Sequence, residues 1–133
     1  LLGDGTTTTL NGKPVKVRDC ESIEKATLLT TDPLRPQLHY DGEAFEKVAK
    51  RAKLFRSWGD CYGYLLVCSG WADAMVDPIL APWDFLPLLP CLEGAGVKVS
   101  NWQGNEVDYS AKQMSLVVSS PGIHGELVAA LNP

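Results

Sequence analysis

Residues 83–96 read Trp-Asp-Phe-Leu-Pro-Leu-Leu-Pro-Cys-Leu-Glu-Gly-Ala-Gly: an acidic residue, an apolar run and a glycine-rich end. The pattern predicts a helical segment over residues 85–92, with Asp84 as the cap that accepts its first backbone amides. Pro87 fits the first turn after such a cap, whereas Pro90 predicts a kink because proline lacks an amide and crowds the preceding turn. A carboxylate at this position can also ligate magnesium, which prefers oxygen ligands. The two interpretations of Asp84 are compatible.

Strand-like and helix-like segments alternate around this stretch. Apolar residues at helical spacing predict helices, and short apolar or β-branched runs predict strands. Asn11-Gly12 predicts a hairpin turn because both residues tolerate a positive φ, and the prolines of residues 32–40 predict a loop. The expected helices cover residues 43–52, 61–68 and 123–131, and the expected strands cover residues 6–10, 14–18, 26–31, 54–56, 74–76, 97–99 and 116–118. We therefore predict a layered α/β fold with helices on both faces of a mostly buried sheet.

The length and composition are those of a protein with one compact core, and they argue against nucleic acid and membranes as partners. The chain has 133 residues, 45% of them hydrophobic, and a net charge of -4, so it has no positive field for nucleic acid. It has neither an apolar run of about 18 residues nor a signal-peptide pattern, so we expect no membrane association. No Cys-x-x-Cys pair occurs, so we expect free thiols and a cytoplasmic location. The cysteines are Cys20, Cys61, Cys68 and Cys91.

Two further acidic residues are candidates for a functional site. Asp77 follows the expected strand at residues 74–76, and ligands collect at strand ends in open α/β sheets. Asp60 lies between Gly59 and Cys61 at the start of an expected helix. A plain helix cap explains Asp60, although amides flanked by glycine can also approach a phosphate. On local evidence alone, the structural roles of these aspartates are favoured over functional ones.

The two histidines do not indicate a catalytic base. His39 and His124 are far apart in the sequence and show no paired ligand spacing. Neither forms a nucleophilic triad with a serine that the sequence singles out. We therefore predict that each is a surface or packing residue.

Residues 83–96 resemble the second signature of the inositol monophosphatase family, in which Trp-Asp and an apolar helix precede Glu-Ala-Gly-Gly. Val97 replaces the usual second glycine. Residues 11–17 are similar to the family's Asn-Gly-x-Pro-x-x-Val hairpin, and residues 69–74 are similar to its Ser/Thr-Gly-x-Ala-Asp-Ala segment. Together these motifs cover nearly the whole chain in the expected order.

One branch of the family is the most similar. In residues 56–64, Gly-Asp-Cys stands where Gly-Ser/Thr-Ala is more usual, as in the histidinol-phosphate phosphatase branch. Met-Val-Asp-Pro at residues 75–78 is also similar to that branch. The resemblance implies the layered αβα carboxy-terminal domain of the inositol-monophosphatase-like sugar phosphatase fold. Residues 1–18 would then be a β-hairpin belonging to the amino-terminal domain, and residues 19–133 the carboxy-terminal domain.

The resemblance also implies roles for individual residues. Asp84 would ligate a catalytic magnesium ion, and Asp77 would contact a hydroxyl or amino group of the substrate. Asp77 is an aspartate where many relatives carry glutamate, so its side chain is shorter. Gly59, Asp60 and Cys61 would line the substrate pocket. The implied reaction is hydrolysis of a small phosphomonoester by water activated at magnesium.

The family's other metal ligands are missing from this sequence. They come from an upstream Glu-Glu pair and an Asp-Pro-x-Asp-Gly-Thr motif, of which Asp4-Gly5-Thr6 matches only the tail. The chain begins without methionine, so we expect a fragment or one of two pieces. We expect the isolated chain to be inactive, and its hairpin edge to associate with an amino-terminal piece or with another copy as a homo-oligomer.

Three functions remain open at this point. The first is half of a histidinol-phosphate phosphatase, and the second is half of an inositol or sugar phosphatase. The third is a non-catalytic binding or assembly module. Upstream acidic motifs in a longer reading frame would favour the enzymes, and a comparison of histidinol phosphate with inositol 1-phosphate would separate the first two.

Overall fold

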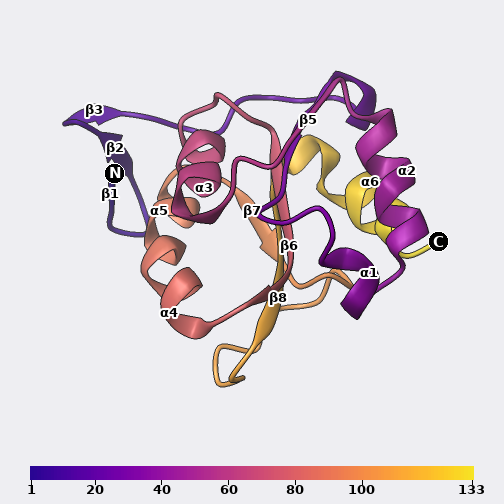
Figure 1. The fold of residues 1–133 in the computed structure, drawn as a ribbon. Helices are drawn as coiled ribbons and strands as arrows, with labels where there is room; N and C mark the ends of the chain where they lie inside the picture. Colours follow the sequence, from indigo (N-terminus) through magenta and orange to yellow (C-terminus); the bar gives the residue numbers. More distant parts are fainter.

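The computed structural model describes residues 1–133 and contains two β-sheets (Figure 1). The larger sheet has the strand order β5-β4-β6-β8-β7. Strands β4, β5 and β6 are parallel, whereas β8 is antiparallel to both of its neighbours. The strands are β4 (Thr27–Leu29), β5 (Leu54–Arg56), β6 (Ala74–Leu80), β7 (Lys98–Ser100) and β8 (Met114–Ser119). All five predicted strands of this sheet are confirmed, although β6 and β8 are longer than predicted and β4 is shorter.

Helices cover both faces of this sheet, as predicted. In Figure 1, α2 and α6 lie on one side of β6 and β8, and α3 and α5 lie on the other. The helices are η1 (Ile23–Lys25), α1 (Pro36–His39), α2 (Gly42–Arg51), α3 (Asp60–Cys68), α4 (Pro82–Phe85), η2 (Leu86–Leu88), α5 (Leu89–Gly94) and α6 (Pro121–Leu131). The order of strands and helices confirms the layered α/β architecture.

Alternating strand residues build the two hydrophobic layers. Leu28 packs among the side chains of α2 and α6, whereas Leu29 packs among those of α3 and α5. In β8, Val117 belongs to the first layer and its neighbours Leu116 and Val118 belong to the second. Successive strand residues point to opposite faces, so an almost unbroken apolar strand is required where both faces are covered.

The smaller sheet is antiparallel and consists of β1 (Leu2–Gly3), β2 (Thr8–Leu10) and β3 (Lys13–Pro14). Its hairpin turn is confirmed, since Asn11 and Gly12 have φ angles of 51° and 78°. The strands are shorter than predicted, and β1 was not predicted. The sheet packs on α5, where the Thr8 hydroxyl donates to the Cys91 carbonyl at 2.7 Å. The proposed boundary between residues 18 and 19 stays a prediction.

Two predictions that rested on the positions of prolines were wrong. Residues 32–40 are not entirely loop, because Pro36 begins the one-turn helix α1, closed by the Tyr40 amide on the Pro36 carbonyl at 2.8 Å. The segment after Trp83 is interrupted one turn earlier than predicted, by η2 around Pro87. Pro90 instead lies in the first turn of α5, where its missing amide would have no helical partner.

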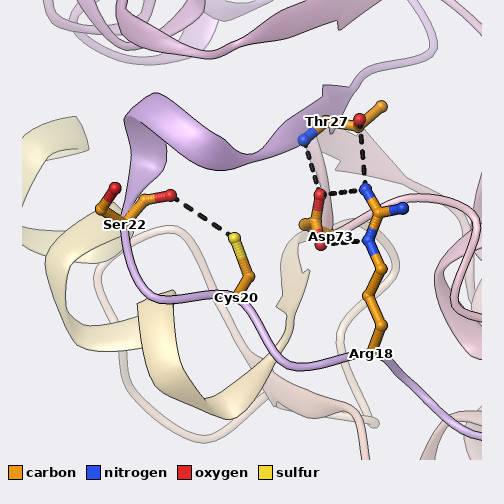
Figure 2. A network of polar contacts seen from close by, with 5 residues as sticks. All are labelled: Arg18, Cys20, Ser22, Thr27 and Asp73. Carbon is orange, nitrogen blue, oxygen red and sulfur yellow. Dashed lines mark hydrogen bonds and ion pairs between the residues drawn. The ribbon is translucent and has the colours of Figure 1, made fainter.

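A buried carboxylate fastens the segment after β3 to the start of the large sheet (Figure 2). Asp73 is 1% exposed and receives two bonds from Arg18, one from Nε at 2.6 Å and one from Nη2 at 2.5 Å. It also accepts the backbone amide of Thr27 at 2.6 Å. Asp73 thus joins the start of β4 to the segment before β6. This contact lies at the amino-terminal ends of the two strands, whereas Thr31 follows the carboxyl end of β4.

The cysteines and histidines agree with their predicted structural roles. All four cysteines are free thiols, and only Cys61 is exposed. His124 is buried between two serine hydroxyls, whereas His39 is exposed. No helix has the length and apolar character needed to cross a lipid bilayer.

Candidate active site

A cleft of about 410 Å³ lies between the start of α3, the end of β6 and helix α4. It brings together three of the predicted site residues, because Asp84 lies beside Asp60 and Cys61 although it follows them by more than 20 positions in the sequence. No lysine or arginine lines it. Its lining residues are Thr31, Asp60, Cys61, Tyr64, Ile79, Leu80, Trp83, Asp84, Pro87 and Leu88.

Asp84 is exposed on this cleft, but it is not the helix cap that the sequence predicted. The cap of α4 is Ala81, and Asp84 is the third helical residue. Its carboxylate reaches back and accepts the Ala81 amide at 3.3 Å, which is its one hydrogen bond within the chain. The helix begins earlier because Pro82 can occupy the first helical position. The remaining carboxylate lone pairs of Asp84 are free for a ligand.

The start of α3 forms a second wall of the cleft. Gly59 is the cap of this helix and Asp60 is its first residue, so Asp60 is not the cap that was predicted. Asp60 has a φ of +53°, a left-handed conformation that aspartate adopts more readily than most residues. Both Asp60 and Cys61 are exposed. The site therefore presents two exposed carboxylates, Asp60 and Asp84.

Asp77 differs from the prediction because it lies within β6 and not after its end. The strand continues to Leu80, with a register shift between Asp77 and Leu80. Asp77 is 1% exposed and lines a smaller neighbouring pocket with Asp32 and Arg35. Burial raises the pKa of its carboxyl group, and hydrogen bonds from Thr31 and then Tyr64 oppose that rise. Contact between Asp77 and a substrate stays a prediction.

Tyr64 connects Asp77 to the cleft. Its hydroxyl donates to Oδ2 of Asp77 at 2.7 Å, and its side chain is 1% exposed. Burial raises the Tyr64 pKa well above its ordinary value, and the negative charge of Asp77 raises it further. Tyr64 therefore stays protonated and acts as a hydrogen-bond donor beneath the cleft.

Thr31 is a residue of the site that the sequence analysis missed. It lines both the main cleft and the smaller pocket, and it contacts Asp77 and Asp60. It follows the carboxyl end of β4, where ligands gather in sheets of this kind. That position was the available signal, but residues 26–31 were predicted to be wholly strand.

The cleft can supply part of a magnesium site. Asp84 offers the oxygen donors that magnesium prefers, and proteins usually give this ion only about one or two carboxylates. No cluster of three or more His, Cys, Asp or Glu side chains in this structure could hold a metal ion. The donor set therefore fits one ligand of a magnesium site and does not complete such a site.

The sequence of this chain is similar to those of known phosphatases. A model of the inositol monophosphatase family matches residues 3–132. The chain is 33% identical to the bifunctional phosphatase IMPL2, chloroplastic, of Arabidopsis thaliana, over 87% of this chain and 33% of that protein. It is 31% identical to a histidinol-phosphatase of Chlorobaculum parvum, over 92% of this chain and 46% of that protein. The chain thus spans less than half the length of these two relatives.

Solved structures share the fold. An inositol monophosphatase from Zymomonas mobilis superposes with a TM-score of 0.82 at 26% identity, over 96% of this chain and 50% of that one. An inositol monophosphatase from Thermotoga maritima superposes with a TM-score of 0.77 at 26% identity, over 92% and 46% respectively. The architecture is that of the carboxy-terminal half of such proteins.

Proposed function

Because this chain belongs to the inositol monophosphatase family, we propose that it is the carboxy-terminal half of a magnesium-dependent phosphomonoesterase, with histidinol phosphate as the leading substrate. Its similarity to a histidinol-phosphatase and the Gly59-Asp60-Cys61 sequence support this choice. An inositol or sugar phosphatase is the second candidate. It is supported by 25% identity to the fructose-1,6-bisphosphatase/inositol-1-monophosphatase of Thermotoga maritima, over 97% of this chain and 48% of that protein.

The observation that carries the proposal is a cleft with two exposed carboxylates and no basic side chain. Such a surface repels a phosphate dianion unless a cation lies between them. Asp84 is well placed to hold that cation, because only one weak backbone contact engages its carboxylate. Asp60 and Cys61 would contact the rest of the substrate. Asp60 suits a substrate with a protonated amine, because the opposite charges attract.

Each part of the chain would contribute a distinct step. Asp84 would hold the metal ion at one edge of the cleft, and the start of α3 would position the organic part of the substrate. Magnesium held by Asp84 would supply activation of the attacking water and neutralisation of the leaving alkoxide. The apolar side chains of Leu80, Trp83 and Leu88 line the cleft beside these carboxylates. We further propose that the remaining metal ligands come from an amino-terminal half, and that the complete protein is a homo-oligomer.

The test uses the complete protein that contains this chain. Phosphate release is measured from histidinol phosphate and from inositol 1-phosphate, with magnesium and with EDTA. We expect magnesium-dependent release, with the higher kcat/KM for histidinol phosphate. Asp84→Asn should abolish turnover, whereas Asp19→Asn, an exposed aspartate outside the cleft, should leave it unchanged. Absence of release from both substrates in magnesium would refute the proposal, and a preference for inositol 1-phosphate would favour the second candidate.

A further inference from the structure

We propose that Asp77 is a positioning residue, which acts through Thr31 to hold the backbone of Asp60 in the conformation that shapes the cleft. This inference rests on the proposed function, because the shaped wall is the one that would bind the substrate. It assigns Asp77 a role different from direct contact with the substrate. The geometry of three connected residues carries it.

The carboxylate of Asp77 is fully engaged by groups of the chain. Its Oδ1 accepts the Thr31 amide at 2.8 Å and the Thr30 hydroxyl at 3.4 Å. Its Oδ2 accepts the Tyr64 hydroxyl at 2.7 Å and the Thr31 hydroxyl at 3.0 Å. A carboxylate has about four lone-pair sites, so these bonds use its capacity. A substrate group could reach Asp77 only by displacing one of these donors.

The hydrogen bond from Thr31 to Asp77 leaves the Thr31 hydroxyl oxygen able to accept a second hydrogen bond. An ionised carboxylate only accepts, so the single hydroxyl proton of Thr31 points to Asp77. The oxygen lone pairs are then free to accept the Asp60 amide, which lies 3.1 Å away. Asp77 thus orients Thr31 as an acceptor toward Asp60, although Asp77 and Asp60 share no hydrogen bond.

Close packing at Gly59 reinforces this connection. A Cβ atom at Gly59 would stand 2.8 Å from Cβ and Oγ1 of Thr31, so only glycine lets the backbone approach this closely. The next residue, Asp60, has a φ of +53°, a region that is costly for residues with a side chain. The bond to Thr31 helps to offset that cost. Thr31 therefore holds the backbone of Asp60 in place, and Asp77 holds the Thr31 hydroxyl in place.

Amide hydrogen exchange of the Asp60 N–H, followed by NMR on this chain, tests the connection without any enzymatic assay. We expect Asp77→Asn to lower the protection of this amide about fivefold, the effect of losing one ordinary hydrogen bond. The reason is that the asparagine NH₂ can donate to Thr31, which turns the hydroxyl proton toward Asp60. Protection at Val117, in the centre of the sheet, reports global stability, so Asp60 should lose protection beyond any change at Val117.

A matched pair at Thr31 provides the control. Thr31→Ser keeps the hydroxyl and should keep the protection of Asp60, whereas Thr31→Val keeps the shape and should lose it. Unchanged protection of Asp60 in Asp77→Asn would overturn the proposal, and so would an equal loss at Val117. If Asp77→Asn does not fold, the Thr31 pair still tests the bond through which Asp77 would act, and equal protection of Asp60 in its two members would overturn the proposal.

The complete phosphatase separates positioning from direct contact. If Asp77 acts through Thr31, Asp77→Asn and Thr31→Val should each raise KM about fivefold with little change in kcat, and the double variant should be no worse than either. Multiplying effects in the double variant would instead indicate direct contact and overturn the proposal. A complete protein without phosphatase activity would refute the proposed function, while the exchange result would still decide the role of Asp77.

Discussion

Replacing His124 with glutamine should remove a pH dependence of stability that is built into the core. The imidazole is 7% exposed, and it lies between Ser119 Oγ, 2.8 Å from Nδ1, and Ser100 Oγ, 2.9 Å from Nε2. Burial, and to a smaller extent the positive charge of Lys98, lowers the pKa of His124 from 6.5 to about 4. In the neutral ring, one nitrogen donates to a serine and the other accepts.

The sign of the effect follows from the two pKa values. Between pH 6.5 and about 4 the unfolded chain binds a proton at His124 that the folded chain does not. Stability therefore falls as the pH drops through this window, and His124 adds no further change below it. The full effect is about 3 kcal/mol, of which about 2 kcal/mol falls between pH 7 and pH 5.

Urea unfolding of the purified chain at pH 7 and pH 5 measures this difference. The unaltered chain should lose about 2 kcal/mol more than His124→Gln over this interval, because carboxylates affect both proteins alike. His39→Gln, at an exposed histidine, should lose as much as the unaltered chain. If the folded ring were doubly protonated and donated to both serines, the unaltered chain would lose no more than His124→Gln. That result would refute the reasoning.

Three further outcomes are expected. Arg18→Met should cost about 3 kcal/mol in urea unfolding because it leaves the buried carboxylate of Asp73 without its cation. By contrast, Arg35→Met, in an exposed pair, should cost less than about 1 kcal/mol, and equal losses would contradict the argument. Asp84→Asn should change the stability of the chain by no more than about 0.5 kcal/mol, since one exposed bond is weakened; a larger loss would mean that Asp84 is structural. The isolated chain at saturating magnesium should release negligible phosphate, and a rate comparable with that of a complete family member would overturn the view that it supplies only part of the metal site.

Several elements could be predicted from the sequence because their causes are local. Asn11-Gly12 turns because these two residues tolerate positive φ, and α2 has a charged face opposite Phe45 and Val48. The apolar runs of β4 and β8 indicated strands covered on both faces. Asp84 could be singled out from its motif, and it lies exposed on the cleft, although its role as a metal ligand stays a prediction.

Features that depend on distant residues could not be predicted in this way. The sequence placed Asp77 at a strand end, but pairing with Leu116 of β8 extends β6 past it and buries it. Thr31 carried no motif, and its importance comes from meeting Asp77, 46 positions away, and Asp60, 29 positions away.

The sequence by itself determined the order of strands and helices, the hairpin turn and the family, because these follow from local backbone preference, hydrophobic period and short motifs. The tertiary structure alone decided which carboxylate faces the cleft and which is buried. Asp84 lies on a short helix at the surface, whereas Asp77 lies in a central strand beneath two threonines and a tyrosine. That distinction depends on strand pairing between segments far apart in the chain, for which no local pattern exists.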